Sequence, residues 1–162
     1  MSFMIKYWWK MNSLEYQKSL PKKRMGAGAL IFNNKKEILL IKSTYKDHWT
    51  LVGGVVDENE SPKEALIREI KEEIGLKITR LDFVMVAYYH ESEEKTENLQ
   101  FKFNAGKLSF KQIKNIKIDH KEIGEFKFFK IKDAFPLMST KGAIRLQESM
   151  KAIKNNKAVY EE

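Results

Sequence analysis

Cysteine is absent from the 162 residues of this sequence. Disulfide bonds and thiolate metal sites are therefore excluded, and any metal site must use other ligands. A chain without cysteine is typical of a reducing compartment, so we expect a cytoplasmic protein. Internal repeats and low-complexity linkers are also lacking, and the length suits one domain with a substantial core.

The sequence also lacks a hydrophobic run long enough to cross a membrane. Its apolar start, MSFMIKYWWKMN, is interrupted by Lys6 and Lys10, is too short to span a bilayer and has no small-residue cleavage site. We predict an N-terminal arm at residues 1–20, which packs on the protein or contacts a partner, and a single domain at residues 21–162. A homodimer formed through the aromatic arm is a hypothesis, and no membrane partner is expected.

The chain has no basic helix and no recognised RNA- or DNA-binding motif, although its net charge is +8. Its 30 basic residues outnumber 22 acidic ones and are scattered along the sequence. A lysine-rich surface is therefore favoured over a nucleic-acid groove, which stays open as the weaker interpretation. A basic chain with a local acidic cluster also suits a polyanionic ligand bridged by a divalent metal ion.

Residues 54–76, GVVDENESPKEALIREIKEEIGL, predict a loop that leads into a short acidic helix. Ser61 supplies a side-chain oxygen for the N-cap, Pro62 takes the first helical position, and Glu64 follows three residues after the cap. Gly75 is the expected C-terminal stop. The helix therefore begins and ends at predictable residues.

The predicted helix has an apolar face and an acidic face. The apolar face repeats every four residues, at Leu66, Ile70 and Ile74. The acidic face gathers Glu69, Glu72 and Glu73, and pairs of these like charges repel by about 0.2–0.5 kcal/mol each at a helix end that already disfavours anions. A solvated acidic surface is the simple alternative. Three carboxylates behind a Gly-Gly turn also offer hard oxygen ligands to Mg²⁺ or Mn²⁺, beside amides suited to an anion.

This segment resembles the Nudix box at every fixed position. The matching residues are Gly54, Glu60 after five residues, Arg68-Glu69-Ile70 after seven more, then Glu72-Glu73 and Gly75-Leu76. Val52 departs from the pattern, because many family members have proline before the Gly-Gly pair. The flanking sequence WTLVGG and the strand pattern also look like the family, so the resemblance extends from Leu20 to about Asn155.

Alternating apolar residues predict the strands around this helix, and a helical spacing predicts a last helix. The expected strands are residues 24–32, 37–42, 49–51, 78–89, 99–105 and 124–131, with helices at 12–19 and 140–154 and an irregular connector at 107–119. Strands grouped apart from helices indicate an α+β fold. Gly26 and Gly28 lack the third glycine of a phosphate loop, and we expect them to allow close packing against a helix.

The resemblance to the Nudix family implies a mixed sheet in an α/β/α sandwich, with the box helix on one face. It also implies roles for the acidic residues. Glu69 and Glu73 are expected as metal ligands, and Glu72 as a ligand or the general base. In several branches of the family the base comes from a later loop, where IDHKEIGE offers His120, Glu122 and Glu125, of which we favour Glu122.

Other residues of the motif are expected to support the site. By analogy with the family, Glu60 and Arg68 form an ion pair that holds the loop to the helix, while an i, i+4 surface pair of Arg68 with Glu72 is the alternative. Gly53 and Gly54 let the backbone approach the metal ion or a phosphate.

The substrate is not identified by the sequence. None of the extra signatures of the ADP-ribose, dinucleoside polyphosphate, NADH or coenzyme A branches is present. The expected activity is Mg²⁺-dependent cleavage of the pyrophosphate bond in a nucleoside diphosphate linked to another moiety, such as a nucleotide sugar, an ADP-ribose-like compound or a nucleoside triphosphate. The alternatives are a module that senses nucleotides without cutting them and an RNA 5′-pyrophosphohydrolase. Four strand aromatics are candidates to stack a base or to pack in the core: Tyr88, Tyr89, Phe101 and Phe103.

Overall fold

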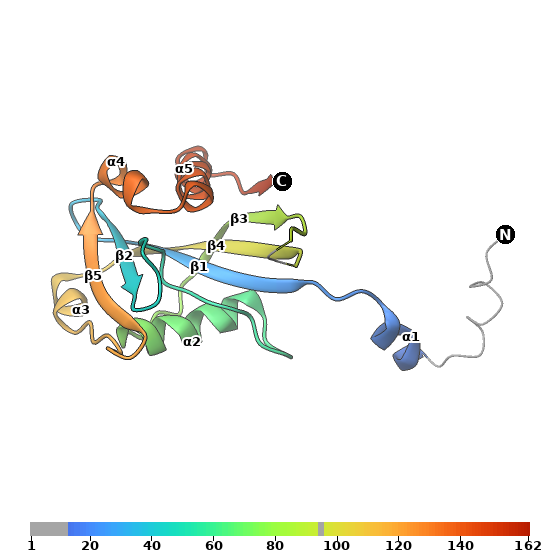
Figure 1. Ribbon diagram of the computed structural model, residues 1–162. Helices are drawn as coiled ribbons and strands as arrows, with labels where there is room; N and C mark the ends of the chain where they lie inside the picture. The colour runs from blue at the N-terminus through green and yellow to red at the C-terminus, as the bar shows by residue number, and fades with distance from the viewer. Residues whose placement is uncertain (1–12, 94–95) are drawn as a thin grey trace.

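The computed structural model describes residues 13–93 and 96–162. The predicted aromatic arm and the dimer contact assigned to it fall largely on residues 1–12, which lie outside the described part of the chain. Helix α1, Ser13–Ser19, contains no buried residue and projects from the domain, as Figure 1 shows. The boundary expected near residue 20 stays a prediction.

The centre of the domain is a six-stranded mixed sheet with the order β5-β2-β1-β4-β3-β6. The strands are β1 Arg24–Phe32, β2 Ile38–Ser43, β3 Asp82–Tyr89, β4 Asn98–Lys107, β5 Ile123–Phe129 and β6 Val159–Glu161. The pairs β1–β4 and β3–β6 are parallel, and the other neighbouring strands are antiparallel. The predicted mixed sheet of an α+β fold is confirmed.

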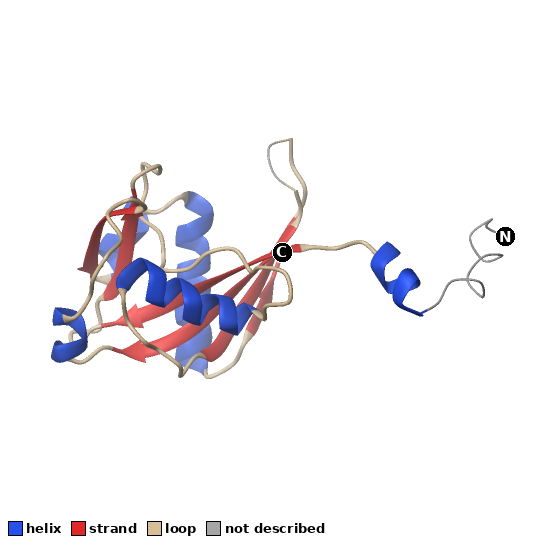
Figure 2. Ribbon diagram, turned by 90° about the horizontal axis from the view of Figure 1, so that it is seen from below, coloured by secondary structure: helices blue, strands red, loops and turns tan. Residues whose placement is uncertain are grey.

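Helices cover both faces of this sheet. One face carries α2, Pro62–Ile74, and the short α3, Phe110–Lys114 (Figures 1 and 2). The other carries α4, Ile131–Ala134, the 3-10 turn Phe135–Leu137 and α5, Thr140–Asn155. The largest buried cluster lies between the sheet and α2, and two smaller clusters lie under α4 and α5. The expected α/β/α sandwich is present.

The ends of α2 follow from its own sequence. The Ser61 side chain accepts from Glu64 N–H, and the Glu64 carboxylate accepts from Ser61 N–H, which completes a capping box. Gly75 ends the helix with φ 70°, in the left-handed region that favours glycine. The apolar face is fully buried against the sheet at Leu66, Ile70 and Ile74. These predictions are confirmed.

Residues 49–56 fill a gap between β1 and β2, which pair directly only at Phe32 and Ile38. The segment bridges to β2 at Thr50 and to β1 at Val52 and Val55. The predicted strand at 49–51 is therefore present only as isolated bridges. The consequence is that the glycine turn 53–54 lies at the level of the sheet, between its two helical layers.

Three other features differ from the sequence predictions. The strand expected at 78–89 begins only at Asp82, although Ile78 and Leu81 are buried, because this stretch packs as extended chain without a pairing partner. The connector expected at 107–119 contains α3, which Ser109 and Gln112 start with a second capping box. The short elements α4, the 3-10 turn and β6 were not predicted, since each is too brief for a periodic pattern.

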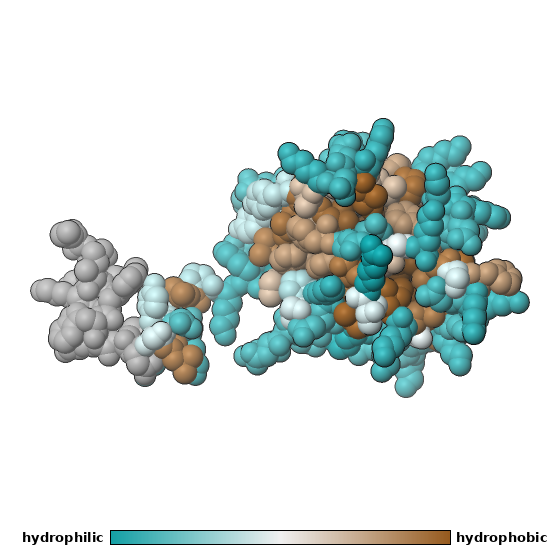
Figure 3. All heavy atoms as spheres, turned by 180° about the vertical axis from the view of Figure 1, so that it is seen from behind, coloured by the Kyte–Doolittle hydropathy of each residue, from teal (hydrophilic) through white to brown (hydrophobic). Residues whose placement is uncertain are grey.

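On the face shown in Figure 3, apolar side chains gather in a patch surrounded by hydrophilic ones. Among the described residues, the most exposed large apolar ones are Leu14, Tyr45, Val55, Phe110 and Tyr160. None of the helices in the described ranges has the length and apolar content needed to cross a bilayer.

Candidate active site

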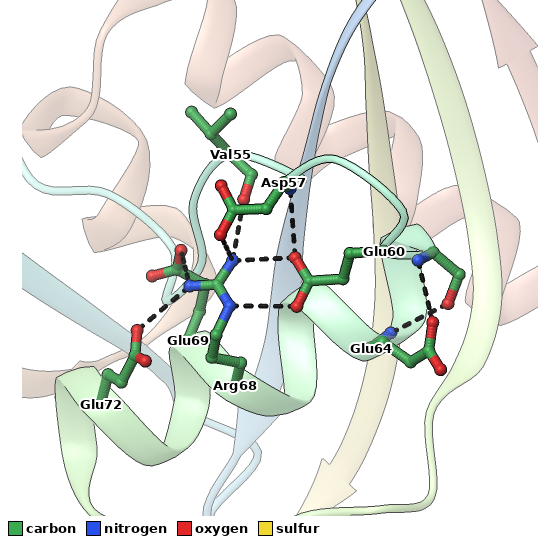
Figure 4. A network of polar contacts seen from close by, with 8 residues as sticks. Val55, Asp57, Glu60, Glu64, Arg68, Glu69 and Glu72 are labelled. Atoms are coloured by element: carbon green, nitrogen blue, oxygen red, sulfur yellow. Dashed lines mark hydrogen bonds and ion pairs between the residues drawn. The ribbon is translucent and has the colours of Figure 1, made fainter.

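Arg68 is the centre of a polar network that ties the loop 55–60 to α2 (Figure 4). Its Nε and Nη2 donate to the two oxygens of Glu60, both at 3.0 Å. Its Nη1 donates to Glu69 at 2.8 Å and to Glu72 at 3.1 Å, and Nη2 also reaches the carbonyl of Val55 at 3.1 Å. One guanidinium therefore fixes both the loop and two of the acidic side chains.

The predicted ion pair of Glu60 and Arg68 is present, and so is the alternative pair with Glu72. The two interpretations are compatible because a planar guanidinium has donors on both sides. The hydrogen bond from Arg68 lowers the pKa of Glu60, and the hydrogen bonds to Glu60 and Glu69 raise the pKa of Arg68. Glu60 and Arg68 are thus held in their charged forms.

Glu73 extends from α2 to the glycine turn. The Gly53 N–H donates to Glu73 Oε2 at 2.7 Å. Burial raises the pKa of Glu73 to about 7, against the effect of the Gly53 hydrogen bond, and the negative charges of Glu69 and Glu122 raise it further. Burial also raises the pKa of Glu69, although Arg68 opposes this shift. Burial therefore disfavours the charged form of both carboxylates.

Glu122 lies on the loop that leads into β5, far from α2 in sequence. Its carbonyl accepts from Thr44 N–H at 2.8 Å, which anchors the loop beside β2. The charge of Glu122 raises the pKa of both Glu69 and Glu73, so the structure brings this predicted base toward the acidic face of α2. Its side chain is exposed and free to meet a ligand there.

The donor chemistry of this cluster fits a hard divalent cation. Within the described ranges, no three acidic or imidazole groups already converge as a metal cage. Glu69 and Glu72 instead point to Arg68, and Glu73 points to Gly53. Burial, and after it the neighbouring acids, raise the pKa values of Glu69 and Glu73, and a divalent cation would stabilise the charged form of both carboxylates.

A cavity of about 270 Å³ lies on the α5 side of the same glycine turn. Gly53 and Gly54 line it, while Glu69 and Glu73 contact this turn from the α2 side. The remaining lining comes from β1, β4, the end of β3, residues 46–51 and 55, and residues 138–145 at the start of α5. The acidic cluster and the cavity therefore meet at two residues without side chains.

Gly26 and Gly28 form part of the floor of this cavity, so their expected packing against a helix is wrong. Along β1, alanines 27 and 29 face the core under α2, and Leu30 faces the core under α5. Alternation places the two glycines on the α5 side. A Cβ on Gly26 would lie 2.6 Å from the Gln100 side chain, and one on Gly28 would lie 2.9 Å from Lys102 Nζ. The glycines make room for two polar side chains of β4.

Sequence reasoning missed the polar residues that line the cavity, chiefly Gln100, Lys102 and Arg145. One signal was available. A central strand of a sandwich is covered on both faces and is expected to be apolar on both, but β4 alternates apolar and polar residues. Of the four candidate stacking aromatics, Tyr89 lines the cavity. Phe101 and Phe103 pack in the core, as the simpler interpretation predicted. Tyr88 does neither, and its hydroxyl donates to the Glu97 carboxylate.

Fold and site together define an α/β/α protein with a carboxylate-rich helix beside a polar cavity. The family comparison agrees with the motif in residues 54–76, because the NUDIX domain family model matches residues 22–152. The chain belongs to the Nudix family.

Similar proteins give the same family and differ in their named activities. An RNA pyrophosphohydrolase of Ruthia magnifica subsp. Calyptogena magnifica is 39% identical over 61 residues, 38% of this chain and 34% of that protein. A putative 8-oxo-dGTP diphosphatase of Bacillus subtilis is 46% identical over 50 residues, 31% of this chain and 34% of that protein. The crystal structure of a MutT protein from Methanosarcina mazei Go1 superposes with a TM-score of 0.66 at 25% identity, covering 86% of this chain and 99% of that one. The chain spans between 6% and 36% of the length of the curated relatives that it matches.

Proposed function

We propose that the protein is a Mg²⁺- or Mn²⁺-dependent pyrophosphohydrolase. Its substrate is a nucleoside diphosphate linked to another moiety, in the class of nucleotide sugars, ADP-ribose-like compounds and nucleoside triphosphates. The observation that carries the proposal is the position of Glu73, a half-buried carboxylate bonded to Gly53, which lines the cavity. A purely structural carboxylate would not be placed where burial and two further acids raise its pKa to about 7.

Each acidic residue has a role in this proposal. Glu69 and Glu73 hold the divalent cation, and Glu72 is a further ligand or the base. When bound, the cation neutralises charge on the phosphoanhydride oxygens and acidifies water. Glu122 is the alternative base, because it approaches the cluster from a separate loop and can accept the proton of the attacking water.

The supporting residues act through position. Arg68 joins Glu60 on the loop to Glu69 and Glu72 on α2, which keeps the carboxylates at a set distance from the turn. The Gly53 amide is already bonded to Glu73, so its role is to position that carboxylate. Gly54 lets the backbone approach the metal ion or a phosphate, and it leaves room for Glu69, because a Cβ there would lie 2.4 Å from Glu69 Oε1.

RNA 5′-pyrophosphohydrolysis is the second candidate. It is favoured by the similarity to the enzyme named RNA pyrophosphohydrolase and by the net charge of +8. This candidate has the same reaction as the first proposal, cleavage of a pyrophosphate bond, but its substrate is an RNA chain instead of a small nucleotide. A sensor that binds without cutting has less support, since a binding module has no need of three mutually repelling carboxylates.

The test of the proposal is a substrate panel with Mg²⁺ or Mn²⁺, with the products resolved by phosphorus NMR. The panel holds nucleotide sugars, ADP-ribose, nucleoside triphosphates and a short 5′-triphosphorylated RNA. We expect metal-dependent release of a nucleoside monophosphate from at least one small nucleotide. Turnover of the RNA alone would favour the second candidate. Binding without turnover of any compound would favour the sensor.

Metal binding at Glu73 can be tested without turnover. We expect Mg²⁺ to raise the melting temperature of the wild type, because a ligand that binds only the folded state stabilises it by an amount that grows with the logarithm of the ligand concentration divided by Kd. The Glu73→Gln variant should melt higher than the wild type in EDTA, since it loses a half-buried charge, and should gain less from Mg²⁺. Differential scanning calorimetry over a range of Mg²⁺ concentrations measures both effects. Equal Mg²⁺ shifts in the two proteins would place the cation elsewhere.

A further inference from the structure

Positive charge dominates the cavity on the α5 side of the glycine turn. The charged residues among its described lining are Arg24, Lys46, Lys102 and Arg145, and no aspartate or glutamate is among them. An adjoining groove of about 620 Å³ shares several of these walls and adds Lys141, again with no carboxylate in its described lining. The substrate region is thus acidic on the α2 side and basic on the α5 side.

Lys102 is the most unusual of these cations. It lies on β4, a central strand, and its half-buried side chain reaches across β1 to the cavity. No described residue forms an ion pair or side-chain hydrogen bond with its ammonium group. Burial and the neighbouring charge of Arg145 lower the pKa of Lys102 to about 8. A partly desolvated cation without a counter-charge destabilises the fold, so an apolar residue would be the more stable choice at this half-buried position.

Arg145 is also incompletely neutralised. Its side chain is 10% exposed, and the guanidinium packs over the ring of Tyr89 at 4.0 Å from the centroid. Its Nη1 lies 3.7 Å from Glu161 Oε1 and 3.4 Å from the carbonyl of Lys141, both long contacts. Its Nε is buried and has no hydrogen-bond partner among the described residues. The pair with Glu161 therefore leaves donor capacity beside the cavity.

The backbone under these side chains is shaped to admit them. Gly28 lies opposite Lys102 in the parallel β1–β4 pairing, and a Cβ at Gly28 would come within 2.9 Å of the ammonium nitrogen. Further along β1, the same face carries Leu30 and Phe32, which fill the core under α5. On this face of β1, apolar side chains fill the space under α5 at the end of the strand. Nearer its start, Gly28 leaves room for the ammonium group of Lys102.

We propose that this cavity binds an anionic group, a phosphate or a carboxylate, that the substrate carries in addition to its diphosphate, with Lys102 and Arg145 as its ligands. The inference rests on the proposed function, which places the diphosphate near Glu69 and Glu73. Because cavity and carboxylates meet at Gly53 and Gly54, one molecule reaches both. The competing occupant is a neutral nucleobase whose carbonyl accepts from Lys102.

Matched ligands that differ by one anionic group distinguish these occupants. UDP-glucuronate and UDP-glucose differ by a carboxylate, and ADP-ribose 2′-phosphate and ADP-ribose differ by a phosphate. Isothermal titration calorimetry in EDTA measures their affinities while turnover is stopped. We expect the anionic member of at least one pair to bind the wild type about 10- to 100-fold more tightly, the effect of one charge-assisted hydrogen bond. The pair that shows the preference identifies the group as carboxylate or phosphate.

Variants at Lys102 connect the preference to this residue. In Lys102→Met the ratio of the two affinities should fall to near one, while Lys102→Arg should keep most of it. Lys107→Met is the matched control, because Lys107 is an exposed lysine at the end of the same strand and should leave the ratio unchanged. Without ligand, Lys102→Met should melt several degrees above the wild type, since it removes an unpaired buried charge. Structural damage would lower the melting temperature instead.

The outcomes separate this inference from the proposed function. Equal affinities within both pairs in the wild type, or no binding of any member, would overturn the anion site. An equal loss for both members of a pair in Lys102→Met would assign Lys102 to the nucleobase. A retained preference with no hydrolysis in the substrate panel would overturn the proposed function alone, and hydrolysis without a preference would overturn the anion site alone.

Discussion

The Glu73→Gln variant is expected to hydrolyse the substrate roughly 10³-fold more slowly than the wild type. Loss of a principal metal ligand removes several kcal/mol of transition-state stabilisation, and each 1.36 kcal/mol is about a factor of ten in rate. Gln keeps the size of the side chain and can still accept from Gly53 N–H, so the turn should stay in place. Initial rates under saturating Mg²⁺, with the best substrate of the panel, measure the effect.

Neighbouring acids provide the comparison for this variant. Glu69→Gln should lose activity to a similar degree, and Glu72→Gln should also fall by several orders of magnitude if Glu72 is a ligand or the base. Glu58→Gln is the matched control, since Glu58 is exposed on the loop before α2 and should change the rate little. Full turnover in both the Glu72 and Glu73 variants would contradict metal-dependent hydrolysis at this helix.

Glu122→Gln then decides the identity of the base. If Glu122 takes the proton of the attacking water, its variant should lose about 10²- to 10⁴-fold in kcat, the usual contribution of general base catalysis. Mg²⁺-dependent stabilisation should persist, because Glu122 is not among the proposed ligands. If kcat is unchanged in this variant, Glu72 is the base. The separate readouts of rate and melting temperature distinguish a base from a metal ligand.

Elements whose signals are local were predicted well from the sequence. Helix α2 begins and ends as predicted, because Ser61, Pro62 and Gly75 determine its ends through contacts with their own neighbours. Strand β1 also matches its prediction at Arg24–Phe32, a mostly apolar run that ends before the turn at residues 34–35. The contact of Glu60 with Arg68 followed from the resemblance to the family and is present.

The cavity could not be predicted in the same way because its residues meet only through long-range pairing. Gly28 and Lys102 become neighbours through the parallel β1–β4 register, and Arg145 lies on α5, which is separated from β4 by four further elements. In sequence, Gly26 and Gly28 resembled packing glycines, and Lys102 resembled one surface lysine among many. A lysine on β4 indicates a polar cavity only once β4 is known to be a central strand of the sheet.

Gly53→Ala is expected to destabilise the fold by at least about 3 kcal/mol, or to prevent folding. Gly53 has φ 139°, a conformation that residues with a Cβ rarely adopt. A Cβ there would lie 2.1 Å from the Ala27 carbonyl oxygen and 2.8 Å from the Gly28 Cα, and rigid backbone atoms of a central strand cannot move aside. Relief requires residues 52–56 to leave β1, which breaks the 2.9 Å bond from Ala27 N–H to the Gly54 carbonyl. Urea unfolding monitored by circular dichroism measures the loss.

The adjacent substitution Gly54→Ala should reduce metal binding and activity but not the stability of the fold, because its Cβ meets a flexible side chain. The new atom would lie 2.4 Å from Glu69 Oε1, and the carboxylate can rotate away at little cost to the fold. We therefore expect a folded protein with near-normal unfolding, a smaller Mg²⁺ shift and a rate reduced toward that of Glu69→Gln. Gly124→Ala, whose Cβ would find only ordinary contacts at 3.6 Å or more, is the control for both. A stable, fully active Gly54→Ala would show that Glu69 is not needed where the structure places it, and the proposed metal site would then be wrong.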